Sequence, residues 1–219
     1  MSENINYPYI VDYLRSILPA RDGLLAEIEE KSKQEESYVP IAEPETAQLL
    51  RVMARLSGGG DFLEIGTGCA YSSIVLARET SGTVTTIERY SKAAGFAREN
   101  IEKAGLSDRI TLLEGEASEI LPSLEGEYSL VFLDAAKGQY PAFLPHILRL
   151  LKAGGILISD NVLYKGMTAE RSLLIRRKIT IVKRLRIYLK TLYETEGLTT
   201  CVLPLGDGVA ISVKGDKNA

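Results

Sequence analysis

The segment Phe62-Leu63-Glu64-Ile65-Gly66-Thr67-Gly68 decides the fold class, because it begins a long alternating pattern. Its apolar run is typical of a buried strand, and the two glycines permit a tight turn into the helical pattern that follows. Further apolar runs alternate with helical patterns and occupy residues 83–87, 110–113, 130–133, 156–158, 199–203 and 209–213. Such alternation predicts a doubly wound α/β fold with a mostly parallel, seven-stranded sheet.

The two ends of the chain extend this prediction. Only residues 204–208 join the last two runs, which is too short for a crossover helix, so an antiparallel hairpin should add a reversed C-terminal strand to the sheet. Residues 1–60 read as helices with breaks at Pro19, Pro40 and Pro44, and should form an N-terminal helical cap and an entrance loop. Residues 1–219 are therefore expected to form a single domain.

Composition limits the function classes. The chain has 45% hydrophobic residues and a formal net charge of -3, which fits a globular protein and gives no overall signal for nucleic acid or membrane. It begins with polar residues and contains no apolar run of about 18 residues, so we expect neither a signal peptide nor a membrane span. A cytoplasmic location without membrane partners is the expectation that follows.

Two polar clusters come directly after predicted buried strands. Asp134 and Lys137 follow residues 130–133, and Asp160 and Asn161 follow residues 156–158. Both clusters should lie at the carboxyl edge of the sheet, where open α/β sheets bind ligands. Two carboxylates and an amide oxygen there predict a site for a hard cation such as Mg²⁺ or Ca²⁺. The alternatives are a strand-ending turn or helix cap at Asp160 and Asn161, and a surface lysine at Lys137.

The glycine loop, together with Glu88, predicts a nucleoside site. Glu88 follows the loop by about 20 residues, at the end of the second predicted strand, where a carboxylate can accept hydrogen bonds from both ribose hydroxyls. Tyr71 stands where a dinucleotide fingerprint has its third glycine, so NAD fits less well than a nucleoside without phosphates. Glu116 and Ala117 follow the third strand, where they could meet an adenine edge or simply form a loop.

The order of these motifs resembles the class I S-adenosylmethionine methyltransferases, and more narrowly the cation-dependent O-methyltransferases that include catechol and caffeoyl-CoA enzymes. The resemblance covers nearly the whole chain, from Val39-Pro40-Ile41 and residues 45–48 through Leu-Glu-Ile-Gly-Thr-Gly to residues 206–210. It implies a Rossmann-like fold, S-adenosylmethionine, Mg²⁺ or another divalent cation, and a homodimer. Ala70 stands where the family often has glycine, and Glu116 where aspartate is commoner.

The resemblance also implies roles for individual residues. Glu64, Gly66, Thr67 and Ser72 would line the methionine part of the cofactor, Glu88 the ribose, and Glu116 with Ala117 the adenine, while Val39 and Asp134 complete the cofactor site. The metal ligands of the family match Asp134, Asp160 and Asn161. Lys137 matches the lysine that takes the hydroxyl proton in the catechol enzymes, so Lys137 and Asp134 are the catalytic candidates.

Positive charge is concentrated near the C-terminus. Residues 171–190 hold eight Lys or Arg and no Asp or Glu, which leaves 18 basic and 29 acidic residues, a balance of -11, in the rest of the chain. If this segment is one helix, its basic residues form a stripe opposite an apolar arc, and the candidates for RNA binding are Arg176, Arg177, Lys183, Arg184 and Lys190. A solvated helix face is the alternative.

Within the family, the sequence is most similar to the bacterial tRNA 5-hydroxyuridine methyltransferases, through residues 13–16, 39–41, 43–45 and 203–208. The expected reaction is Mg²⁺-dependent methylation of the 5-hydroxyl of wobble 5-hydroxyuridine in the tRNA anticodon, giving 5-methoxyuridine. A flipped base would present two neighbouring oxygens to the metal, as a catechol does. The alternatives are the same chemistry on a small catechol-like phenol, a non-catalytic RNA-binding module and, most distantly, a dehydrogenase.

Overall fold

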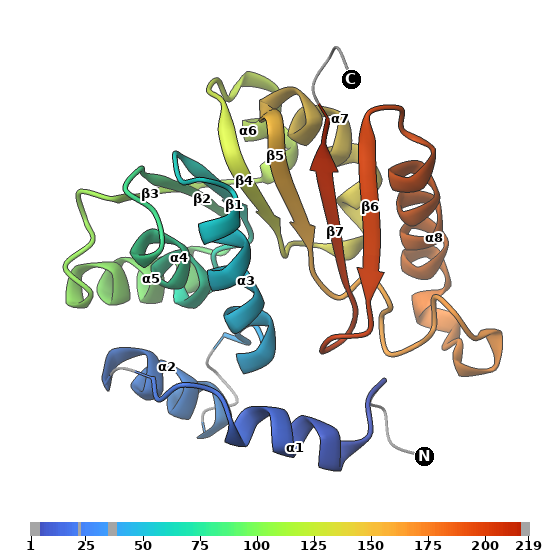
Figure 1. The fold of residues 1–219 in the computed structure, drawn as a ribbon, viewed down its shortest axis with the longest axis horizontal. Helices are drawn as coiled ribbons and strands as arrows, with labels where there is room; N and C mark the ends of the chain where they lie inside the picture. The colour runs from blue at the N-terminus through green and yellow to red at the C-terminus, as the bar shows by residue number, and fades with distance from the viewer. Residues whose placement is uncertain (1–4, 22, 35–38, 216–219) are drawn as a thin grey trace.

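The computed structural model describes residues 5–21, 23–34 and 39–215, and a seven-stranded sheet forms its centre (Figure 1). The strand order is β3-β2-β1-β4-β5-β7-β6. Strands β1 to β5 pair in parallel, and β7 is antiparallel to both β5 and β6. The strands are β1 (Phe62–Ile65), β2 (Val84–Glu88), β3 (Ile110–Glu114), β4 (Tyr128–Leu133), β5 (Leu151–Ser159), β6 (Leu198–Leu203) and β7 (Val209–Lys214). The predicted fold class, including the reversed C-terminal strand, is confirmed.

Helices cover both faces of the sheet. On one face lie α3 (Pro44–Leu56), α4 (Tyr71–Arg78) and α5 (Ser91–Lys103), and on the other α6 (Ala117–Ser123), α7 (Tyr140–Leu150) and α8 (Ile179–Glu194). Strands β1 and β4 are buried along their whole length, which explains why their sequences are mostly apolar, with Glu64 and Ser129 as the buried polar exceptions, rather than alternating. None of the helices in the described ranges is long and apolar enough to cross a bilayer.

The N-terminal region contains α1 (Pro8–Ser16) and α2 (Gly23–Gln34). The expected breaks agree with this arrangement, since Pro19 and Pro40 lie between helices and Pro44 begins α3. Only Ile28 of α2 is buried, and no residue of α1 is. The region therefore rests on the surface of the sheet domain rather than contributing much to its core.

One helix prediction was wrong in part. The basic segment was expected to be continuous over residues 171–190, but α8 begins only at Ile179, and two short 3-10 turns precede it, η2 (Arg171–Leu173) and η3 (Arg176–Lys178). The Glu170 side chain accepts a hydrogen bond from the Ser172 amide and starts a separate turn. Leu174 and Ile175 then adopt extended backbone, and Ile175 is 49% exposed instead of packed. Arg176 and Arg177 consequently lie on η3 rather than on the helix.

Candidate active site

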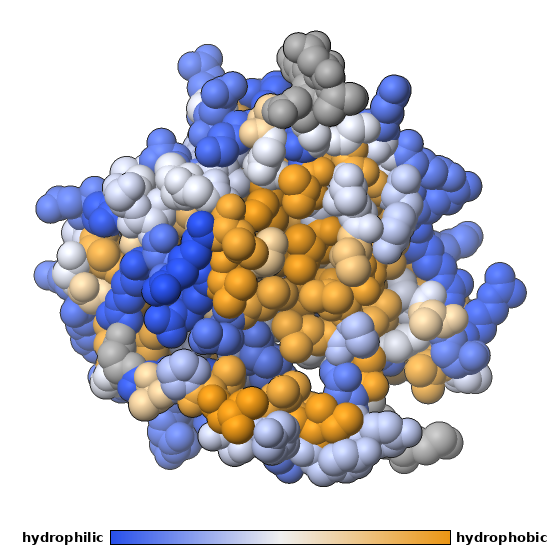
Figure 2. Space-filling model, in the orientation of Figure 1, coloured by the Kyte–Doolittle hydropathy of each residue, from blue (hydrophilic) through white to orange (hydrophobic). Residues whose placement is uncertain are grey.

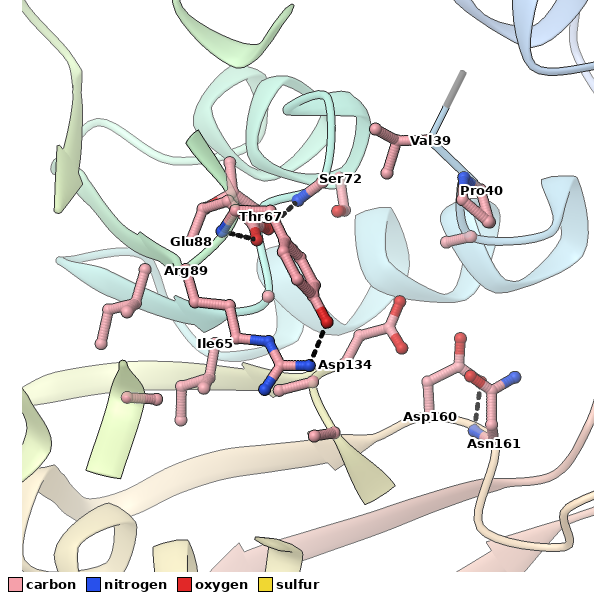
Figure 3. Close-up of a pocket in the computed structure, with 18 of the residues that line it drawn as sticks. Val39, Pro40, Ile65, Thr67, Ser72, Glu88, Arg89, Asp134, Asp160 and Asn161 are labelled. Atoms are coloured by element: carbon pink, nitrogen blue, oxygen red, sulfur yellow. Dashed lines mark hydrogen bonds between the residues drawn. The ribbon is translucent and has the colours of Figure 1, made fainter. Parts of the chain in front are cut away.

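The strand register brings the functional residues to one edge of the sheet. Ile65 pairs with Leu133 and Leu133 with Ser159, so the residues that follow these strands emerge at the same level. A cleft of about 470 Å³ opens there (Figure 3). Residues 39–43 of the entrance loop form part of its wall. The lining includes every residue predicted for the cofactor except Glu64, namely Val39, Gly66, Thr67, Ser72, Glu88, Glu116, Ala117 and Asp134.

Gly66 is required by a close backbone approach. It has a left-handed backbone, with φ at 103°, and a Cβ at this position would lie 2.1 Å from the carbonyl oxygen of Asp134. The turn after β1 can therefore pass beside the end of β4 only if this residue lacks a side chain. Ala70 is also left-handed, with φ at 68°, a conformation that glycine adopts more readily than alanine.

Glu88 lies at the end of β2 with its carboxylate fixed by the backbone. Its two oxygens accept hydrogen bonds from the amides of Gly68 and Tyr90, each at 2.9 Å. The side chain is buried except at the cleft, where it is part of the lining. This is the placement that a carboxylate needs to accept hydrogen bonds from ribose hydroxyls.

Arg89 and Tyr90 also line the cleft, although neither was predicted from the sequence as a site residue. The Arg89 guanidinium lies 4.4 Å from the centre of the Tyr90 ring and 3.6 Å from a carboxylate oxygen of Glu116. This ion pair connects the loop after β2 to the loop after β3. No motif marks these residues in the sequence, and only their position directly after Glu88 could have suggested them.

Glu64 differs from its predicted role. It is completely buried beneath the cleft and does not line it. Its carboxylate accepts hydrogen bonds from the hydroxyls of Ser72 and Ser73 and, at 2.6 Å, from Thr86. Burial raises the pKa of Glu64 to about 7, although the three hydroxyl donors oppose that rise. In this structure Glu64 holds the start of α4, and thereby Ser72, in position.

Asp134, Asp160 and Asn161 come together at the floor of the cleft, as the sequence predicts (Figure 3). Asp160 is 3% exposed, and burial raises its pKa to about 7, with the negative charge of Asp134 adding to the effect and Lys137 opposing it. Asn161 has a left-handed backbone, and its backbone N–H donates to Asp160 Oδ1 at 2.7 Å. The cluster thus contains two carboxylates that repel each other in a region of low solvent exposure.

This donor set fits a hard divalent cation. Within residues 5–21, 23–34 and 39–215, no three His, Cys, Asp or Glu side chains are grouped to hold a metal ion. A cation bound by Asp134 and Asp160 would take the side-chain oxygen of Asn161, which also lines the cleft, as a further donor. Oxygen donors of this kind are what Mg²⁺ and Ca²⁺ prefer, and a cation would offset the repulsion between Asp134 and Asp160.

Lys137 and Asp207 complete the polar floor. Lys137 begins the short turn η1 (Lys137–Gln139), and its Nζ lies 2.5 Å from Asp134 Oδ1. Asp207, in the turn between β6 and β7, also lines the cleft, and its carboxylate accepts a hydrogen bond from the Lys165 amide. Burial raises the pKa of Asp207. In the sequence, Asp207 stands out only as part of residues 206–210, which resemble the family, and no role was predicted for it.

The predicted RNA-binding residues lie outside the cleft. All five are exposed, and none contributes to the lining: Arg176, Arg177, Lys183, Arg184 and Lys190. Arg186, on the same helix, has a structural role instead, because its guanidinium donates to the carbonyl oxygens of Thr168 at 2.8 Å and Met167 at 3.1 Å. The basic segment therefore combines an exposed stripe with one residue that anchors the loop after Asn161.

Comparison with known proteins agrees with this geometry. Residues 18–215 match the protein family described as O-methyltransferase. A relative from Mycolicibacterium smegmatis assigned to the O-methyltransferases is 32% identical over 175 residues, covering 78% of this chain and 81% of its own. The catechol O-methyltransferase of Niastella koreensis is 33% identical over 135 residues, 59% of this chain and 61% of its own.

Among solved structures, the O-methyltransferase from Bacillus cereus in complex with SAH aligns with a TM-score of 0.83 and 27% identity, covering 94% of this chain and 97% of its own. The family match spans most of the sequence and includes every residue that we place at the cleft. The chain belongs to the O-methyltransferase family, and it is an enzyme of that class.

Proposed function

We propose that the protein transfers the methyl group of S-adenosylmethionine to the 5-hydroxyl of wobble 5-hydroxyuridine in tRNA, with Mg²⁺ or another divalent cation, and so forms 5-methoxyuridine. One observation carries this proposal. Asp134, Asp160 and Asn161 lie beside Lys137 on the floor of the same cleft whose wall holds Glu88. A cation site, a base and a nucleoside site therefore share one cavity.

The cofactor would occupy the part of the cleft between the loops after β1, β2 and β3. Glu88 is positioned for the ribose, Glu116 and Ala117 for the adenine, and the turn at Gly66 and Thr67 for the methionine end. The complex of the Bacillus cereus relative with SAH supports this choice of cofactor. S-adenosylmethionine supplies an electrophilic methyl group on a sulfonium, so the protein has to supply an oriented and deprotonated oxygen.

Asp134, Asp160 and Asn161 would hold the cation. When bound, a divalent cation lowers the pKa of a coordinated hydroxyl and fixes its oxygen for attack. Lys137, as an uncharged amine, would accept the hydroxyl proton at Nζ and become an ammonium group, and its 2.5 Å contact with Asp134 holds Nζ at the floor of the cleft. Because Asp160 is almost fully buried, the cation site excludes much of the competing water.

The exposed basic stripe favours an RNA substrate. Phosphate groups are held largely by Lys and Arg, and the stripe adjoins the turn that carries Lys137 through the contact between Arg184 and Gly138. A wobble base flipped out of its stack would enter the cleft while its neighbouring phosphates lie along α8. A tRNA substrate also places the reaction in the cytoplasm.

A small catechol-like phenol is the second candidate. The similarity to the Niastella koreensis catechol O-methyltransferase favours it, and a catechol offers the same pair of neighbouring oxygens to the cation. Such a substrate would need the cleft but not the basic stripe. The two candidates therefore differ in whether residues of α8 affect turnover.

A reconstituted assay tests the proposal. The purified protein is incubated with S-adenosylmethionine and Mg²⁺ and with either tRNA bearing 5-hydroxyuridine or a panel of catechols, and the products are identified by mass spectrometry. We expect 5-methoxyuridine as the main product. Methylation of catechols alone would contradict the tRNA assignment while leaving the chemistry intact, and methylation of neither would contradict both.

A further inference from the structure

Behind the candidate cation site, one buried hydroxyl joins the ends of β4 and β5. The Tyr140 hydroxyl donates to the carbonyl oxygens of Leu133 and Asp160, each at 3.0 Å. A carbonyl oxygen can only accept, so Tyr140 is the donor in both contacts and the two oxygens share its single proton. Leu133 ends β4 directly before Asp134, and Asp160 directly follows β5. The same side chain therefore holds the backbone at both carboxylates of the site.

The contact with Leu133 also closes the loop that carries Lys137. Residues 134–139 lie between the two partners, and Tyr140 begins α7 directly after η1. Asp134 and Lys137 therefore lie on a short loop whose two ends are joined by a hydrogen bond. One hydroxyl thus fixes the loop with the proposed base as well as the two strand ends.

The ring of Tyr140 is held firmly in the core. It is completely buried and does not line the cleft. It packs edge to face against Tyr188 of α8, with the ring centres 5.3 Å apart and 67° between the ring planes. Because Tyr140 lies behind the cleft wall, it cannot touch a substrate or the cofactor. Any effect on the reaction has to pass through the backbone that its hydroxyl holds.

The direction of the Asp160 side chain depends on this hydroxyl. On one side of Asp160, its N–H donates to the Leu133 carbonyl oxygen at 3.0 Å, and on the other side its carbonyl oxygen accepts from Tyr140. Asp134 repels the nearby Asp160 carboxylate, which favours separation of the two loops. Mg²⁺ binding requires oxygens in nearly ideal octahedral positions, so a small shift of either carboxylate would weaken it.

We propose that Tyr140 is a positioning residue, which keeps Asp134 and Asp160 at the separation that a divalent cation requires. This role rests on the cation-dependent reaction proposed above and extends it to a residue behind the site. Groups that hold metal ligands by hydrogen bonds typically raise metal affinity about 10–100-fold. A hydroxyl that served only the core would affect stability but not cation binding.

Mn²⁺ binding, measured by electron paramagnetic resonance of the free ion, tests the proposal without turnover. Tyr140→Phe removes the hydroxyl and keeps the ring. We expect the Mn²⁺ affinity to fall roughly 10–100-fold, because the backbone at the two carboxylates is no longer held. The affinity for S-adenosylhomocysteine, measured by calorimetry, should stay close to wild type, since Tyr140 does not line the cleft.

Tyr188→Phe is the matched control. The two tyrosines are equally buried and in contact, but the Tyr188 hydroxyl bonds to Ser159 Oγ, at 2.6 Å, rather than to the carbonyl oxygens of both strands. Both variants should lose stability in urea unfolding, because each leaves buried polar groups without a partner. Only Tyr140→Phe should lose Mn²⁺ affinity. The rise in the free energy of unfolding on adding Mn²⁺ gives the same comparison for a less stable variant.

The two substitutions should leave the outer surface unchanged. Figure 2 shows exposed apolar side chains over β7, on the face of the sheet opposite to α7 and α8. Both tyrosines are buried on the α7 and α8 side. Size-exclusion elution of both variants should therefore match the wild type, so a change in self-association would not explain a lower Mn²⁺ affinity.

The possible failures can be told apart. Equal Mn²⁺ affinity in the wild type and Tyr140→Phe would overturn the role of Tyr140 and leave the proposed function intact. An equal loss of affinity in Tyr188→Phe would also overturn it, because core packing in general would then control the site. A wild-type protein that binds no Mn²⁺ would overturn both the role of Tyr140 and the cation dependence of the proposed reaction.

Discussion

Arg184 and Gly138 link the basic helix to the active site. The guanidinium of Arg184 donates to the carbonyl oxygen of Gly138 at 3.1 Å. Gly138 lies in η1 between Lys137 and Gln139, both of which line the cleft. A polyanion bound along α8 would therefore lie within one short turn of the proposed base, and this contact would connect substrate binding to the chemistry.

The double variant Lys183→Glu and Lys190→Glu should weaken the reaction with tRNA and leave a small phenol unaffected. Each lost phosphate contact lowers the slope of log(kcat/KM) against log salt concentration by roughly 0.7–0.9. The measurement is a salt series with tRNA. Lys103→Glu, on α5 at the other end of the sheet, is the control and should keep the wild-type slope. An unchanged slope in the double variant would remove α8 from the RNA site.

Arg186→Met should destabilise the protein without changing the salt slope. The substitution leaves the carbonyl oxygens of Met167 and Thr168 without their donor, which costs about 1–3 kcal/mol for groups that are largely buried. Urea unfolding measures this loss directly. If Arg186→Met instead lowered the salt slope and left stability unchanged, Arg186 would belong to the RNA-binding stripe.

Asp160→Asn should reduce turnover at least ~100-fold while the affinity for S-adenosylmethionine stays close to wild type.

In metal-free buffer, the stability of the Asp160→Asn variant relative to the wild type should be greater at pH 8 than at pH 6. The folded-state pKa of Asp160 lies at about 7, above its ordinary value, so the wild type loses stability as pH rises through this range and the amide does not. Thermal melts at both pH values and calorimetric titration with cofactor check the two parts. Retained turnover would exclude Asp160 from the chemistry.

Glu64→Gln should remove a second pH-dependent contribution to the free energy of unfolding. Burial raises the pKa of Glu64 to about 7, so in the folded state this carboxyl binds its proton more tightly than in the unfolded chain. Its contribution to stability is complete below its ordinary pKa and is lost as pH rises through about 7. The free energy of unfolding of the wild type minus that of the variant should therefore fall between pH 5 and pH 8, as measured by urea unfolding. A difference that rises with pH would contradict the buried, proton-binding state of Glu64.

Much of the fold and of the candidate site could be predicted from the sequence because both depend on local patterns. The apolar runs located every strand, and parallel strands necessarily bring the residues after them to one edge, which placed Asp134 and Asp160 together. The apolar pattern gave a wrong prediction where contacts between distant residues decide the backbone conformation. The helical spacing of apolar residues includes Leu174 and Ile175, yet these two residues have extended backbone and separate η2 from η3 and α8.

The roles of residues that depend on contacts with distant parts of the chain could not be predicted from the sequence either. The family motif predicted that Glu64 contacts the cofactor, but Glu64 is buried below the cleft, where it accepts hydrogen bonds from Ser73 and Thr86. Arg89 directly follows Glu88, but its ion pair with Glu116 depends on the loops after β2 and β3 lying side by side. Arg186 cannot be distinguished in the sequence from the other basic residues, because its two carbonyl partners lie on a distant loop.

The central claim is that Asp134, Asp160 and Asn161 bind one divalent cation next to the methyl donor. Anomalous diffraction from crystals grown with Mn²⁺ and S-adenosylhomocysteine tests it most directly. We expect a single strong peak coordinated by oxygens of these three side chains, at the floor of the cofactor cleft. The absence of a peak there at saturating Mn²⁺, or a peak bound by other residues, would contradict it.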